Sequence, residues 1–183
     1  MVGSWPGPHA HCETFDPAIG GNGILLYLSL STIAFAEVKI NSIIKLENRI
    51  PNECGLGFLI EKDDLSYSAA VSIKKLDNMD TLSIFEIKSS STIEHADLIT
   101  SASKISELLD KKEFRKKNLK FSGVTPEDSM TFFFQDLLIN GGTISIDKIP
   151  YEIQGPIDSK VRLEYLFCTG EMFLPNYESN KNE

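Results

Sequence analysis

Polar and apolar residues alternate along the chain from residue 37 onward. In segment 38–47, Val38, Ile40 and Ile44 lie on one side of an extended chain, and the intervening positions are mostly polar. This period of two predicts a half-buried strand. Segments 55–60, 68–74 and 81–88 predict three more strands, separated by short polar turns. Four strands joined in this way indicate an antiparallel meander.

The pattern changes to helical spacing after residue 92. Leu98, Ala102, Ile105 and Leu109 are separated by four, three and four positions, which predicts a helix. Segment 93–100 is also compatible with a strand, and both alternatives stay open.

A second helix is expected over residues 126–139. Thr125 is a suitable N-cap, Pro126 suits the first helical position, and Gly141 can end the helix in the left-handed conformation. A strand is also expected before this helix, at 119–124, and two more after it, at 143–147 and 161–168. The order of elements predicts an α+β fold with a mainly antiparallel sheet covered by two helices.

An uncharged apolar run, residues 24–36, precedes these elements and ends in Ala-Phe-Ala. It has the length of a signal-peptide core and a small-x-small cleavage pattern, and it is too short to span a bilayer. Residues 1–23 contain no Lys or Arg, which signal peptides normally carry before the apolar core. Either these residues result from a start site placed too early, or the run is not a signal and the N-terminus is an atypical tail. We expect a signal peptide, a single mature domain over 37–175 and a polar tail over 176–183, with a periplasmic or secreted product.

Charge narrows the range of partners. The 183 residues carry a net charge of −8, and residues 37–183 carry −6 because the leader region holds only two acids. An acidic protein repels phosphate backbones, so we expect no nucleic-acid partner. No apolar run after Ala36 reaches membrane-spanning length.

Cys54 and Cys168 remain if the leader is removed. In an oxidising compartment this even number predicts a disulfide between them. Without export, two separate buried thiols are expected instead.

Candidate catalytic chemistry is sparse. The chain has no nucleophile elbow, phosphate-binding loop, zinc spacing or EF-hand loop, so we expect no cofactor and no metal. His9, His11 and Cys12 are a weak metal signal on the N-terminal extension. His95 is expected at the start of a helix in an ordinary surface role, and the acids Glu127 and Asp128 are explained by the first turn of a helix.

Two features indicate a possible partner surface. One is a basic run, expected near the end of a helix, that comprises Lys111, Lys112, Arg115, Lys116 and Lys117. The other is the triplet 132–134, because three consecutive rings cannot all face one core. Burial of the third ring under a neighbouring strand is expected, and Phe132 in contact with a partner is the alternative.

These observations favour an exported, non-catalytic binding or envelope-associated protein whose partner is another protein or an envelope component. A small hydrolase that gathers carboxylates from distant strands is the rival hypothesis, and a small-ligand carrier is a third. Convergent acids in a pocket, or His95 beside an acid, would favour the enzyme. An exposed patch around Phe132 would favour the binding protein.

Overall fold

The alternating segments form a six-stranded antiparallel sheet in the computed structural model, which describes residues 36–62, 64–76, 81–125 and 127–173. The spatial order of its strands is β1 (Glu37–Glu47), β2 (Ile50–Lys62), β3 (Leu65–Lys75), β4 (Thr81–Ser89), β7 (Asn118–Val124) and β6 (Lys111–Arg115). The first four strands pair consecutively, so the predicted meander is confirmed.

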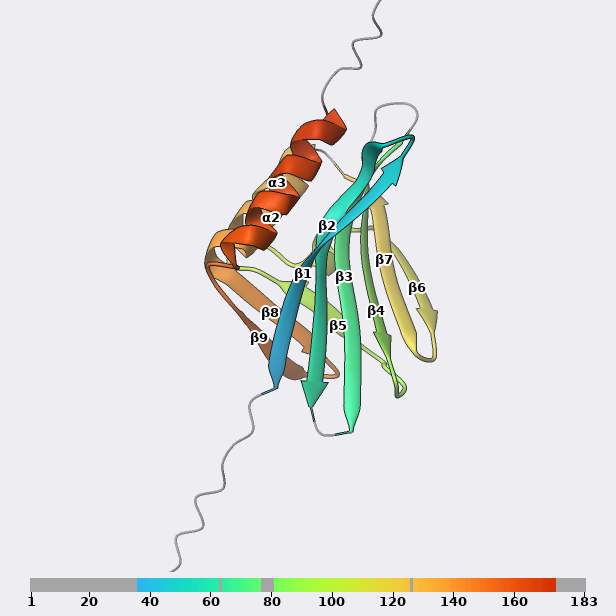
Figure 1. Cartoon of the computed structure of the whole chain (residues 1–183). Coiled ribbons are helices and arrows are strands. Elements are labelled where there is room, and N and C mark those ends of the chain that lie inside the picture. The colour runs from blue at the N-terminus through green and yellow to red at the C-terminus, as the bar shows by residue number, and fades with distance from the viewer. Residues whose placement is uncertain (1–35, 63, 77–80, 126, 174–183) are drawn as a thin grey trace, which may run out of the picture. The chain divides into compact units, whose positions relative to one another are not determined.

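A second, smaller sheet and the helices complete the fold (Figure 1). The small antiparallel sheet has the order β5 (Ala96–Ile99), β8 (Gly141–Ile146) and β9 (Ile149–Gln154). The helices are α1 (Ile105–Leu108), α2 (Glu127–Asn140) and α3 (Ser159–Phe173). The predicted α+β class is therefore confirmed.

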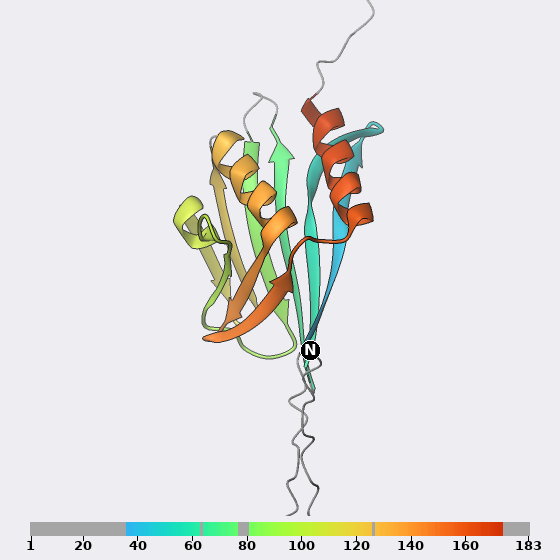
Figure 2. The same cartoon turned by 90° about the vertical axis from the view of Figure 1, so that its left-hand side faces the viewer.

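The core lies between two layers. One face of the large sheet is covered by α2 and α3 and, further along the strands, by the small sheet (Figures 1 and 2). Phe58, Val71 and Phe85 point from the large sheet into this core, where Phe133 and Phe134 of α2 are also buried. Alternation along the strands thus places one apolar face against the helices.

Helix α2 matches its prediction closely. It ends at Asn140, and Gly141 follows with a φ of +77°. A Cβ atom at Gly141 would overlap the carbonyl oxygen of Ile153, so the position requires glycine for space as well as for conformation.

The strand predicted over 161–168 is wrong, because this segment belongs to helix α3. Val161, Tyr165, Cys168 and Met172 are spaced by four, three and four residues, and all four are buried. The period-two pattern arose because Leu163 and Phe167 are also apolar, but both are exposed on the helix.

The helix predicted over 98–109 is also wrong. The segment holds strand β5 and the single turn of α1, joined by a tight turn in which the Thr100 amide donates to the Ser103 carbonyl. Leu98, Ile105 and Leu109 are buried, although they come from separate elements. The strand alternative for 93–100 was therefore the better one, and His95 precedes a strand rather than a helix.

The described residues belong to one compact unit. Residues 1–35 and 174–183 lie outside the description, so the expected extension, leader core and polar tail stay predictions. Within residues 36–173, no helix has both the length and the apolar character needed to cross a bilayer.

Candidate functional site

The three phenylalanines of α2 point in different directions. Consecutive helical positions are about 100° apart, so the rings cannot share one face. Phe133 and Phe134 are buried, whereas 65% of Phe132 is exposed. The expected burial of the third ring under a strand is therefore wrong.

Helix α3 adds apolar side chains to the same outer layer. Leu163, Leu166 and Phe167 are each more than half exposed, as is Ile139 of α2. We call the five residues Phe132, Ile139, Leu163, Leu166 and Phe167 the helix-layer surface. Phe132 was a candidate from the sequence, whereas the other four residues were missed. The three residues of α3 were missed because segment 161–168 was interpreted as a strand, although the helical spacing from Val161 to Met172 could have shown which positions face outward.

A groove of about 340 Å³ separates the two helices. Its floor contains Ile73 of β3 together with Phe134 and Tyr165, whose rings stack with centroids 4.6 Å apart. Gln135 of α2 and Leu166 of α3 also line it. Figure 2 views the layer from the side on which α2 and α3 lie next to each other.

The groove carries no charged side chain among its lining residues. Burial raises the pKa of Tyr165 far above its ordinary value, so its phenol is neutral at all physiological pH values. An uncharged, mostly apolar surface favours an apolar occupant, because a charged one would lose its hydration without gaining a partner.

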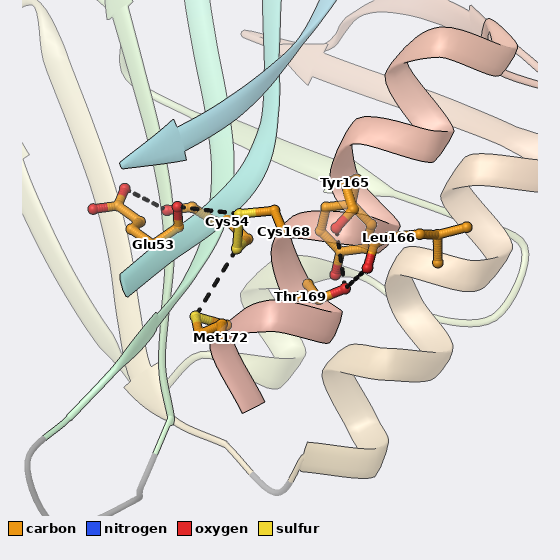
Figure 3. Close-up of a disulfide and its surroundings, with 8 residues drawn as sticks. Glu53, Cys54, Tyr165, Leu166, Cys168, Thr169 and Met172 are labelled. Atoms are coloured by element: carbon orange, nitrogen blue, oxygen red, sulfur yellow. Dashed lines mark hydrogen bonds between the residues drawn. A yellow bond between two sulfur atoms is a disulfide. The ribbon is translucent and has the colours of Figure 1, made fainter. Parts of the chain in front are cut away.

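A disulfide joins Cys54 of β2 to Cys168 of α3, with the Cα atoms 5.8 Å apart (Figure 3). The structure thus contains the pair expected from the sequence. Met172, one turn further along α3, contacts Cys54, and both cysteines are buried. The bond fixes α3 on the large sheet and so holds one wall of the groove in place.

The basic run lies on a different part of the fold. Lys111, Lys112 and Arg115 belong to β6, the edge strand of the large sheet, and Lys116 and Lys117 form the turn to β7. The expected helix end at this position is wrong. Exposed cations on an edge strand hinder pairing with other sheets, which gives the run a structural role.

His95 and an acidic residue line the same cavity, of about 430 Å³. Asp97 of β5 and Ser106 of α1 line it together with His95. The Ser106 hydroxyl donates to the Asp97 carboxylate at 2.6 Å. Among the described residues, the His95 ring makes no hydrogen bond with either of them, so the three side chains are not arranged as a nucleophile, base and orienting acid.

Three carboxylates line another cavity, of about 500 Å³, between β1 and the connection from β9 to α3. They are Glu37, Glu152 and Asp158, and Asp158 accepts a hydrogen bond from the Lys160 amide at the start of α3. No three acidic, histidine or cysteine side chains within the described ranges gather closely enough to hold a metal ion. The side chains of Glu127 and Asp128, as well as His9, His11 and Cys12, lie outside the description.

Comparison with protein-family models, with curated proteins and with solved structures finds no match for this chain. Its function must therefore be inferred from the geometry above.

Proposed function

We propose that this chain is an exported, non-catalytic binding protein whose interhelical groove receives an apolar helix of a partner protein. The observation that carries this proposal is the uncharged groove between α2 and α3. Leu166 of the helix-layer surface lines this groove, and the other four residues of that surface are exposed on the same two helices. Large exposed apolar patches on soluble domains mark interaction sites. Amphipathic helices commonly bind such grooves through apolar anchors on one face.

The disulfide supports the exported part of the proposal, because such bonds persist in oxidising compartments. The expected cleavage point also coincides with the start of the fold. Ala36 would be the last leader residue, and Glu37 begins β1. Mass spectrometry of the exported protein should find a chain that begins at Glu37, and a cytosolic product that retains Met1 would contradict export.

A binding experiment tests the groove. The probe is a synthetic amphipathic helix with Leu and Phe on one face, labelled for fluorescence anisotropy. Leu166→Glu should weaken binding about tenfold or more, because it places a charge at the edge of an apolar groove. Phe114→Glu is the matched control, since Phe114 is similarly exposed but lies on β6.

Equal affinities for the Leu166 and Phe114 variants would contradict the proposal, as would a probe that does not bind. If a small apolar ligand binds the groove and the helical probe does not, the carrier hypothesis is favoured.

A hydrolase is the second candidate, because His95, Asp97 and Ser106 share one cavity. A reaction there would require the His95 ring to approach the Ser106 hydroxyl in place of Asp97. Hydrolysis of a simple ester by the purified protein, lost in both His95→Ala and Ser106→Ala, would replace the binding proposal with this one.

A further inference from the structure

Among the described residues, strand β1 has a pairing partner on one side only, since it is the first strand of the large sheet. It is joined to β2 by a two-residue turn, Asn48 and Arg49, which both have positive φ. In such a turn the flanking residues form the hydrogen-bonded pair, here Glu47 and Ile50. The pairing shifts register between Lys45 and Leu46, but the extra residue lies on β2, so the alternation of β1 continues through it. Strand geometry then directs the amides and carbonyls of odd-numbered residues of β1 toward β2 and those of even-numbered residues toward the open edge.

One contact agrees with this assignment. The carbonyl of Ser42, an even-numbered residue, accepts a hydrogen bond from the Asn41 side chain rather than from a strand. The open edge is also poorly protected against pairing. Strand β1 is eleven residues long and contains no proline, and its lysines Lys39 and Lys45 already pair with Glu61 and Glu53 of β2.

The core-side face of β1 leaves apolar residues exposed near its end. Ile44 is 44% exposed and Leu46 61% exposed. At the other end of the same strand, the cavity between β1 and the connection from β9 to α3 is lined by Val38, Ile40 and Ile157 together with the three carboxylates described above. One strand thus carries both protruding apolar side chains and one wall of a recess that is partly apolar.

We propose that a second copy of this chain pairs with β1 in antiparallel orientation, with Asn41 of each copy on the two-fold axis. Even-numbered residues then pair with even-numbered residues, Ile40 with Ser42 of the second copy and Val38 with Ile44 of the second copy. The contact is isologous, so every interaction occurs twice. The two large sheets join into one continuous sheet.

The charges along β1 favour this register over the neighbouring one centred on Ser42. With Asn41 at the centre, Glu37 lies opposite Lys45 of the second copy, and Lys39 lies opposite the uncharged Ile43. Opposite charges across a strand pair are stabilising, whereas like charges are destabilising. If the centre moves by one residue to Ser42, Lys39 faces Lys45 and Glu37 faces Glu47, so that both charge pairs become repulsive.

The register also fills the recess. Side chains of even-numbered residues point to the helix-covered side of the sheet, where the cavity lies. Ile44 of the second copy falls opposite Val38, which lines that cavity, and Leu46 follows it just beyond Glu37, where the exported chain would begin. Each copy therefore covers the exposed apolar residues of the other, and a cavity of about 500 Å³ is occupied.

A cysteine scan tests the register in the full chain, with Cys12→Ser in every variant to remove an unrelated thiol. Asn41 faces itself in a non-hydrogen-bonded pair, where Cα atoms are about 4.5 Å apart and a disulfide can form. Asn41→Cys should form a covalent dimer about tenfold faster than Lys39→Cys, because residues 39 of the two copies lie about 13 Å apart. Equal rates for the two variants would overturn the register and with it the proposal.

Sedimentation measurements test the association itself. The full chain should sediment at twice its 20.4 kDa mass at micromolar concentration. Ile44→Asp should weaken dimerisation about tenfold or more by placing a charge in the recess. Ile50→Asp is the matched control, because Ile50 is equally exposed but lies on β2 outside the interface.

A monomer up to submillimolar concentration, or an Ile50→Asp effect as large as that of Ile44→Asp, would refute the dimer. Circular dichroism of both variants verifies that they are folded. Neither substitution touches the interhelical groove, so failure of this proposal and failure of the groove proposal are distinguishable.

Discussion

Asp136, which is partly exposed, connects two elements. Its carboxylate on α2 accepts hydrogen bonds from Asn140, from the Ser101 hydroxyl and from the Ala102 amide. These donors, Asn140 first and Ser101 next, lower the pKa of Asp136 to about 2. The ionised side chain thereby connects the turn after β5 to α2, one of the two helices that line the interhelical groove.

Replacement of Asp136 by Asn should lower the free energy of unfolding at neutral pH by about 0.5–1 kcal/mol, because the charge-assisted hydrogen bonds are lost at a partly exposed site. The pKa of Asp136 is lower in the folded state than the ordinary value of 3.8. Its contribution is therefore complete above about pH 4 and disappears as the pH falls toward 2.

Urea unfolding between pH 2 and pH 6 measures this contribution. The difference between wild type and Asp136→Asn should shrink below pH 4. Glu171→Gln, a change at an exposed carboxylate of α3, should leave the curve of the wild type unchanged. A difference that stays constant down to pH 2 would argue against the linkage.

At the scale of elements, α2 and α3 differ in how directly their sequences specify them. Thr125 and Gly141 mark the ends of α2 with residues suited to a cap and to a positive φ. In α3, the alternation from Val161 to Phe167 fits a strand as well as a helix. The helical spacing appears only when the segment is followed to Met172, and contact with the large sheet and the bond to Cys54 bury that side of the helix.

Phe133 and Phe132 lie on different faces of α2, so replacing each by alanine should change the free energy of unfolding by different amounts. Phe133→Ala should lower the free energy of unfolding by about 3–5 kcal/mol, because it leaves a cavity in the core. Phe132→Ala should change it by less than about 0.5 kcal/mol, since that ring is mostly in solvent. Chemical denaturation of both variants provides the comparison, and similar losses would mean that Phe132 is packed.

On the scale of the whole molecule, the disulfide is the longest-range covalent constraint among the described residues. Cys54 and Cys168 are separated by 114 positions, and their bond joins the large sheet to the last helix. Cross-links that close long loops restrict the unfolded chain most strongly.

The variant Cys54→Ala/Cys168→Ala should therefore unfold with about 4–5 kcal/mol less free energy than the oxidised wild type. Adding a reductant to the wild type should lower its stability in the same direction, while the double variant should not respond. If the reductant leaves the denaturation midpoint of the wild type unchanged, the disulfide does not stabilise the fold.

The sequence by itself determined the meander of β1 to β4, helix α2 and the cysteine pair, because alternation, capping residues and cysteine count are local or compositional signals. The tertiary structure decided that segment 159–173 is helical, that no strand covers the ring of Phe132 among the described residues, and that His95, Asp97 and Ser106 share a cavity. These outcomes depend on contacts between residues far apart in the chain. When apolar positions fit both the period of a strand and the period of a helix, they do not determine which of the two forms. Packing against a neighbouring layer then decides which positions are buried, and with them the type of element.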